Sequence, residues 1–78
     1  MCYLEISERY MKNEPYVRLS TGENVYEWVK NYLKRNKIDS LEKSFYGENY
    51  LVIYFNTEHQ KNCFVRIGNS IFPYFEFQ

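Results

Sequence analysis

The chain has 78 residues, ten of them basic and ten acidic, so it has zero formal charge and room for one domain, residues 1–78, but not for two cores. A neutral chain lacks the long-range positive field that draws proteins to nucleic acids or anionic membranes. The sequence has no recognisable signal peptide and no apolar stretch long enough to span a bilayer, so we expect a cytoplasmic protein without membrane association.

Aromatic side chains are frequent, at 21% of the residues, with nine Tyr, six Phe and one Trp. Large aromatic side chains dominate both cores and interfaces, and Tyr is favoured on surfaces that are wet when free and buried when bound. A small domain with a single short helix has too little interior for this many rings. We therefore expect some of them to lie on an interaction surface.

The N-terminal segment has two possible interpretations. Cys2, Leu4 and Ile6 alternate with more polar residues, which is typical of a strand. A second pattern, which includes Tyr10 and Met11, fits one face of a helix. We favour a strand over residues 1–14 and keep a helix as the alternative, with a further short strand over residues 16–19.

Residues 24–36 are expected to form an amphipathic helix. Asn24 is a candidate N-cap, and Glu27 lies three residues further on, as a capping box requires. The apolar residues recur at spacings of three and four and so share one face. They are Val25, Trp28, Val29, Tyr32 and Leu33.

The remainder of the chain is expected to be β structure. The apolar run "YLVIYF" at residues 50–55 predicts a strand, preceded by a strand over residues 41–45 and a turn at residues 47–49. After a polar turn at residues 56–62 we expect strands at residues 63–67 and 71–77, the last at a sheet edge because Pro73 has no N–H to donate. The predicted fold class is α+β, an antiparallel sheet of four to five strands with the one helix packed on one face.

This arrangement divides the strand residues between two faces, because successive side chains in a strand alternate. An aliphatic set that includes Leu51, Ile53 and Phe55 is expected to meet the helix. The other face is the expected partner-binding surface. Its predicted members are Tyr50, Tyr54, Phe64, Arg66, Phe72 and Tyr74. Three candidates could pack on this face: the N-terminal segment, a second copy of the chain in a homodimer, or a different partner.

Residues suited to catalysis, metal binding or cofactor binding are not grouped in the sequence. The three glycines are isolated, so no phosphate-binding loop is present. His59 and Cys63, with Cys2, supply too few ligands for a structural zinc site. The same pair with Glu58 resembles a nucleophile, its base and an orienting carboxylate, but a free, buried Cys63 is expected to be inert. We therefore expect a non-enzyme with no catalytic residue, no metal and no cofactor.

An alternative is that the aromatic face binds a small ligand, a nucleotide or a single-stranded nucleic acid by stacking. The segment "NCFVRIG" lacks the basic-Gly-aromatic-Gly signature of RNA-recognition strands. Nucleic acid is thus a less favoured partner than protein.

The segments "EPYVRL", "GENVYEWVKNYL" and "FVRIGNSIF" occur in an order that resembles a family of small phage-encoded proteins named for a Pro-Gly-Asp-Tyr-Gly motif. The chain departs from that motif at Gly68-Asn69-Ser70-Ile71, where only Gly68 matches, and the match implies a turn there. The resemblance implies a phage origin. Small proteins of this kind often bind and block a host factor, so we expect a host protein target, with an anti-defence inhibitor of the anti-CRISPR type as the leading example.

Overall fold

The computed structural model of the chain describes residues 2–12 and 22–77. The strands are β1 (Cys2–Ser7), β2 (Asp39–Phe45) and β3 (Glu48–Phe55), and the helices are α1 (Glu8–Lys12), α2 (Val25–Arg35) and α3 (Glu58–Ile71). The predicted strand at residues 16–19 lies outside the described residues.

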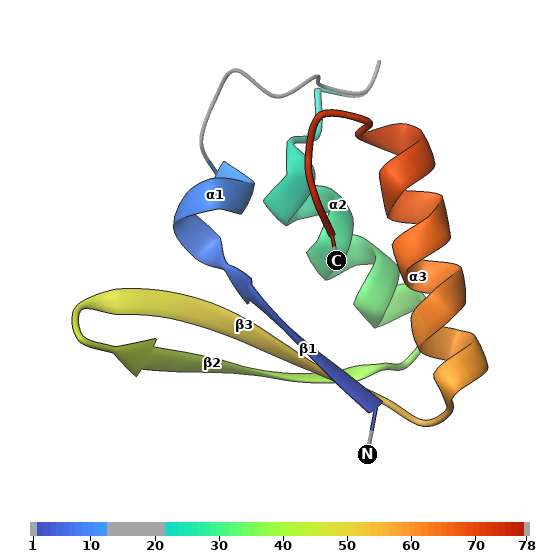
Figure 1. Cartoon of the computed structure of the whole chain (residues 1–78), viewed down its shortest axis with the longest axis horizontal. Helices are drawn as coiled ribbons and strands as arrows, with labels where there is room; N and C mark the ends of the chain where they lie inside the picture. The colour runs from blue at the N-terminus through green and yellow to red at the C-terminus, as the bar shows by residue number, and fades with distance from the viewer. Residues whose placement is uncertain (1, 13–21, 78) are drawn as a thin grey trace.

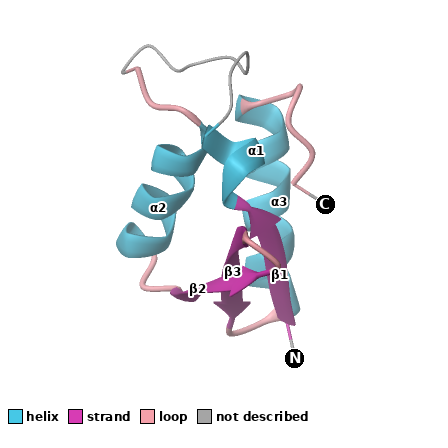
Figure 2. Cartoon of the chain, turned by 90° about the vertical axis from the view of Figure 1, so that its left-hand side faces the viewer, coloured by secondary structure: helices cyan, strands magenta, loops and turns pink. Residues whose placement is uncertain are grey.

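The three strands form one antiparallel sheet in the order β1-β3-β2 (Figure 1). The described helices lie together on one side of it (Figures 1 and 2). The predicted α+β class is confirmed. The predicted number of four to five strands is wrong, since the described residues form three strands, and so is the prediction of one helix, since they form three helices.

The N-terminal segment combines both interpretations. β1 pairs with β3 from Cys2 opposite Phe55 to Ser7 opposite Tyr50, and the chain then turns directly into α1. Leu4, Ile6 and Met11 are buried on the same side of the sheet as the helices. This segment therefore extends the sheet at one edge and does not fold over the opposite face.

Helix α2 has the start that the sequence predicts. The Asn24 side chain accepts a hydrogen bond from the Glu27 backbone N–H at 2.9 Å, and the Asn24 N–H donates to the Glu27 carboxylate at 3.0 Å. This is the reciprocal capping box. Val25, Trp28, Val29 and Leu33 are buried, as their spacing predicts, and Tyr32 packs half-buried at the margin of the core.

The turn between β2 and β3 has two residues, Tyr46 and Gly47, with φ values of 51° and 78°. Positive φ at both central positions is the conformation that matches the twist of a hairpin, and glycine adopts it at no steric cost. Strand β3 begins at Glu48, so the predicted turn at residues 47–49 lies one residue too late.

The largest correction concerns the C-terminal third. Residues 58–71 form α3, where the sequence analysis expected a polar turn and a strand at residues 63–67. Thr57 is the N-cap of this helix: its hydroxyl accepts the Gln60 N–H at 3.1 Å, while Gln60 Oε1 accepts the Asn56 N–H at 2.9 Å. The sequence "TEHQ" carries this helix-start signal, but residues 56–62 were interpreted as a polar turn before the apolar run that follows.

The predicted final strand at residues 71–77 is also wrong. Ile71 ends α3, and the following residues run back as an irregular segment beside α2 and α3 (Figure 1). The Phe72 N–H donates to the Gly68 carbonyl at 2.8 Å, and the Phe77 N–H donates to Asn69 Oδ1 at 3.4 Å. This segment buries three further rings, those of Phe72, Phe75 and Phe77.

Some of the aromatic side chains that the sequence analysis expected at the surface are therefore in the core. The Trp28 ring centroid lies 5.8 Å from that of Phe64 and 5.9 Å from those of Phe72 and Phe77, and the Phe55 and Phe64 centroids are 5.5 Å apart. Leu51, Ile53 and Phe55 bring the sheet to this cluster, as expected. Phe64 and Phe72, which the sequence analysis placed on a binding face, are fully buried core residues.

Gly68 is the position at which α3 makes room for the C-terminal segment. A Cβ atom added there would lie 2.8 to 2.9 Å from three ring carbons of Phe77. We expect Gly68→Ala to lower the free energy of unfolding by about 1 to 3 kcal/mol, the usual cost of overpacking, in urea denaturation.

The control is the same substitution in a Phe77→Ala background. There the clash is gone, and alanine's better helix propensity, about 0.8 to 1 kcal/mol, makes Gly68→Ala neutral or stabilising. Equal destabilisation in both backgrounds would show that Phe77 does not pack against Gly68.

Candidate protein-binding face

The side of the sheet opposite the helices, here called the bare face, is not covered by any described element. Cross-strand register places one group of side chains on it. These are Tyr3 and Glu5 on β1, Tyr50, Val52 and Tyr54 on β3, and Asp39, Leu41, Lys43 and Phe45 on β2. The same register includes Ser7 and Glu48 at the strand ends, but the Ser7 hydroxyl is buried and Glu48 is paired with Arg9, so neither is counted in the bare face.

Apolar side chains form the centre of the bare face. Val52 is buried there among its strand neighbours, between Glu5 and Leu41 in the register. Tyr50 and Tyr54 are half-buried on either side of it. A hollow of about 340 Å³ lies over β3 and is lined by Glu5, Lys43, Phe45, Tyr50 and Val52. The face is therefore largely apolar, with a few charges.

The hairpin tip continues this surface. Phe45 is 64% exposed and Tyr46 is 92% exposed, and their ring centroids lie 4.5 Å apart in an edge-on arrangement. Large rings held in water on a projecting turn contribute little to the core. Exposed apolar groups gathered next to one another are typical of an interaction surface.

The structure divides the six residues that the sequence analysis grouped as a partner-binding face. Tyr50 and Tyr54 lie on the bare face, whereas Phe64 and Phe72 are in the core. Arg66 is exposed on α3 with its guanidinium 3.8 Å from the Cys63 sulfur, and Tyr74 is exposed in the C-terminal segment. The six residues therefore do not form one surface.

Four exposed apolar residues were not assigned to the binding surface from the sequence. Three lie on the bare face, Tyr3, Leu41 and Phe45, and the fourth, Tyr46, is at the hairpin tip. The alternation of Leu41, Lys43 and Phe45 before a Tyr-Gly turn was the available signal, because it indicates a strand with one apolar face leading into a hairpin.

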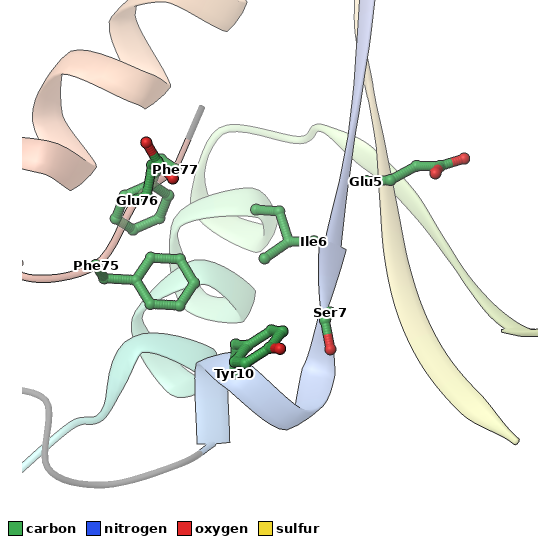
Figure 3. A pocket seen from close by; sticks show the side chains of 7 residues that line it. All are labelled: Glu5, Ile6, Ser7, Tyr10, Phe75, Glu76 and Phe77. Carbon is green, nitrogen blue, oxygen red and sulfur yellow. The ribbon is translucent and has the colours of Figure 1, made fainter.

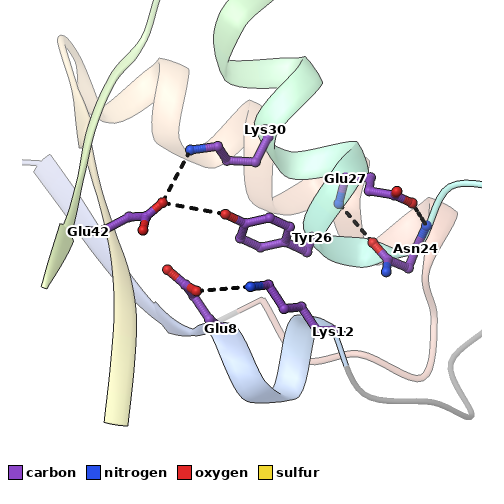
Figure 4. Close-up of polar contacts among 7 residues, drawn as sticks. All are labelled: Glu8, Lys12, Asn24, Tyr26, Glu27, Lys30 and Glu42. Carbon is purple, nitrogen blue, oxygen red and sulfur yellow. Dashed lines mark hydrogen bonds and ion pairs between the residues drawn. The ribbon is translucent and has the colours of Figure 1, made fainter. Parts of the chain in front are cut away.

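A polar cluster attaches the hairpin to the helices (Figure 4). Glu42 of β2 accepts a long hydrogen bond of 3.5 Å from the Tyr26 hydroxyl and lies 3.8 Å from Lys30 Nζ. Lys12 Nζ lies 4.4 Å from the centre of the Tyr26 ring and donates to Glu8 Oε1 at 3.2 Å. The two carboxylates of the cluster are thus paired with two ammonium groups. Such an arrangement is typical of contacts that stabilise a fold.

Glu8 is the buried charged residue of this cluster. It is 6% exposed, and its second carboxylate oxygen, Oε2, has no hydrogen-bond partner among the described residues. Burial, followed by the negative charges of Glu42 and Glu8, raises the pKa of Tyr26 above 10.0.

A second hollow, of about 310 Å³, lies between β1, α1 and the C-terminal segment (Figure 3). Ile6, Tyr10 and Phe75 point toward one another there, and Glu5 points to the other side of the strand (Figure 3). The buried Ser7 hydroxyl has no described partner. The lining residues include no histidine, cysteine or lysine that would act as a base or nucleophile.

The environment of Cys63 differs from the buried strand position that the sequence analysis expected. Cys2 and Cys63 are free but half-buried, and Cys63 is on a helix instead of a strand. His59 Nε2 lies 3.5 Å from the Cys63 sulfur one turn away, while Glu58 accepts a hydrogen bond from the Cys2 thiol at 3.6 Å. Glu58 thus contacts the other cysteine.

Metal ligands are not assembled in the part of the chain that the structure describes. No group of three or more His, Cys, Asp or Glu side chains is placed there to hold an ion. Residues 2–12 and 22–77 also include no helix that is both long and apolar enough to cross a bilayer.

Comparison of the chain with protein-family models, with curated proteins and with solved structures found no match. The resemblance to small phage-encoded proteins therefore remains a prediction from the sequence.

The polar cluster has a pH dependence that can be measured. Because the pKa of Tyr26 is raised, the native state holds the phenol proton more tightly than the unfolded chain does. Its contribution to stability is fully present below pH 10 and is lost as the pH rises through the folded-state pKa. We expect Tyr26→Phe to make the fall in unfolding free energy above pH 10 shallower.

Urea denaturation at a series of alkaline pH values measures this slope. Burial also raises the pKa of Tyr32, so part of the slope persists in the variant. Tyr46→Phe is the matched control, because this side chain is 92% exposed when folded. An identical slope in wild type and Tyr26→Phe would contradict the role given to Tyr26.

Proposed function

We propose that this chain is a non-catalytic protein-binding domain that occludes a partner through the bare face and the hairpin tip. The observation that supports this most strongly is the continuity of exposed apolar side chains from Tyr3 and Leu41 to Phe45 and Tyr46. A domain with the capacity to enclose Trp28 and five Phe rings in its core leaves these side chains in water.

The energetics favour a large, flat partner. Fully burying a side chain such as Leu or Phe contributes roughly 1.5 to 3 kcal/mol, so covering several half-exposed side chains gives several kcal/mol in total. The hollow over β3 is lined by Glu5, Lys43, Phe45, Tyr50 and Val52. A small ligand there would leave the exposed Tyr3, Leu41 and Tyr46 uncovered. A protein surface covers the bare face and the projecting tip at the same time.

The charges on the bare face indicate the chemistry of the partner. Glu5 and Asp39 are carboxylates, and Lys43 is the one basic side chain in the set defined above. The complementary partner is an apolar protein surface with Lys or Arg at its margin. The same charges disfavour a phosphate backbone, so a single-stranded nucleic acid is the weaker candidate.

The resemblance of the sequence to phage-encoded proteins supports a target in the cytoplasm of a bacterial host. Occlusion of a host defence component, as by an anti-CRISPR protein, is the form of this proposal that agrees best with a small chain that exposes a group of apolar side chains on one face of its sheet. Blocking by coverage requires only contact area and no reactive group.

The proposal is tested by affinity capture from bacterial lysate with paired variants. We expect Phe45→Asp and Tyr54→Asp to abolish enrichment of the captured protein, because each places a charge on apolar surface that the partner desolvates. Tyr74→Asp is the matched control, since Tyr74 is 77% exposed but lies away from the bare face. Trp28, at 4% exposed, reports by fluorescence that each variant is folded.

Loss of the captured protein with Tyr74→Asp but not with Tyr54→Asp would refute the bare face as the binding surface. Titration with single-stranded oligonucleotides tests the weaker candidate. We expect no perturbation of the Tyr3 and Tyr54 resonances in NMR spectra, and saturable shifts confined to them would favour stacking of bases over protein binding.

A further inference from the structure

The outer edge of β2 is an open pairing site within the described structure. β2 pairs with β3 along one side, and all seven of its residues are exposed. No described element lies along its other side, which is the free edge of the order β1-β3-β2. An edge strand presents unpaired N–H and C=O groups that form hydrogen bonds with another strand.

We propose that β2 pairs antiparallel with β2 of a second copy of this chain, so that two three-stranded sheets join into one sheet of six strands. The side chains of β2 support this occupant because they are self-complementary in one register. This inference does not depend on the proposed function, since the contact is made by the edge of β2. Asp39, Leu41 and Lys43, which flank that edge, form only the margin of the bare face.

Symmetry limits the possible registers. A homodimer of this kind has a twofold axis perpendicular to the sheet, which keeps the bare faces of both copies on the same side. Directly opposed residues in an antiparallel pair also point to the same side. The two numbers in each opposed pair must therefore be both odd or both even, and their sum is the same even number along the interface.

The register with a sum of 82 satisfies both the charges and the apolar contacts. It sets Asp39 opposite Lys43 of the second copy, and the twofold axis repeats this ion pair on the other side. Leu41 lies on the axis and meets its own symmetry mate. On the helix side, Ser40 lies opposite Glu42, whose carboxylate can accept the serine hydroxyl.

The neighbouring registers are less favourable. A sum of 84 sets Glu42 against its own mate, and a sum of 86 does the same with Lys43, so both oppose like charges across the strands. A sum of 80 sets Asp39 against Leu41 and leaves Lys43 without a partner. In the single chain, neither Asp39 nor Lys43 makes an ion pair with any described residue, which leaves both side chains available for the interface.

The dimer would double the bare face without covering it. Both copies present Tyr50, Val52 and Tyr54 on the same side of the six-stranded sheet, and Leu41 fills the junction. Pairing of single edge strands buries less than the roughly 1,200 Å² of a stable interface, so the association is concentration-dependent. A partner that spans the junction would strengthen it.

Charge exchange tests the proposal on the purified protein. Sedimentation equilibrium over a range of concentrations should show reversible dimers for the wild type. Asp39→Lys alone or Lys43→Asp alone should weaken dimerisation at least about tenfold, because each opposes like charges twice. The double variant Asp39→Lys/Lys43→Asp restores both pairs and should recover dimerisation. All these positions are exposed, so the fold is expected to be kept.

Cysteine cross-linking tests the register. In a Cys2→Ser/Cys63→Ser background, Leu41→Cys should form an intermolecular disulfide on mild oxidation, since directly opposed Cα atoms lie about 4.5 to 5.5 Å apart. Lys43→Cys is the matched control. In the proposed register residue 43 faces residue 39 of the second copy. Residue 43 of that copy is four residues away along the strand, about 13 Å, so the two introduced cysteines should not cross-link.

A wild type that stays monomeric at every concentration overturns the proposal. So does failure of the double charge exchange to restore a dimer, or preferential cross-linking through Lys43→Cys. None of these results affects capture of a partner by the bare face, so failure of the dimer and failure of the proposed function are distinguishable.

Discussion

The packing of Trp28 against the phenylalanines of α3 and the C-terminal segment is the interaction on which the rest of the structure depends. Trp28 comes from α2, Phe64 from α3, and Phe72 and Phe77 from the segment that follows. Each ring is within 6 Å of the indole, centroid to centroid. These contacts join α2, α3 and the last described residues of the chain into one core.

This cluster explains why the sheet is covered on one side only. The apolar residues of α2, α3 and the C-terminal segment are used on the same side, together with Leu51, Ile53 and Phe55. Helices α1 and α2, which lie between β1 and β2 in the sequence, are also on that side (Figure 1). A chain of 78 residues has no further described element with which to shelter the bare face. Exposure of Tyr3, Leu41 and Phe45 follows from the architecture.

Local signals were sufficient to predict α2 and the β2–β3 hairpin. The capping box at Asn24, the period of the buried residues in α2, and the continuous apolar run of β3 all act within a few residues and are satisfied in the structure. The expected class, α+β, followed from them. The inward face of β3 was also correct, because alternation along one strand fixes it once a single neighbour is known.

The C-terminal third could not be predicted in the same way. "CFVRI" has high strand propensity, which favours a strand over the helix-start signal of "TEHQ" before it. In the structure it is helical, and Phe64 and Gly68 pack against Phe77. Those contacts join residues that a local pattern cannot bring together. The error then moved Phe64 and Phe72 to the wrong side of the sheet, so that of the candidate site only Tyr50 and Tyr54 lie on the bare face.

Strand β2 contributes no buried side chain to the domain, because all its residues are exposed and the core is assembled from other elements. Its side chains, apart from Glu42 with its contacts to Tyr26 and Lys30, can therefore be replaced with little loss of folding free energy. A strand of this kind is open to rapid evolutionary change: selection can alter what it recognises while the remainder of the chain keeps the fold constant.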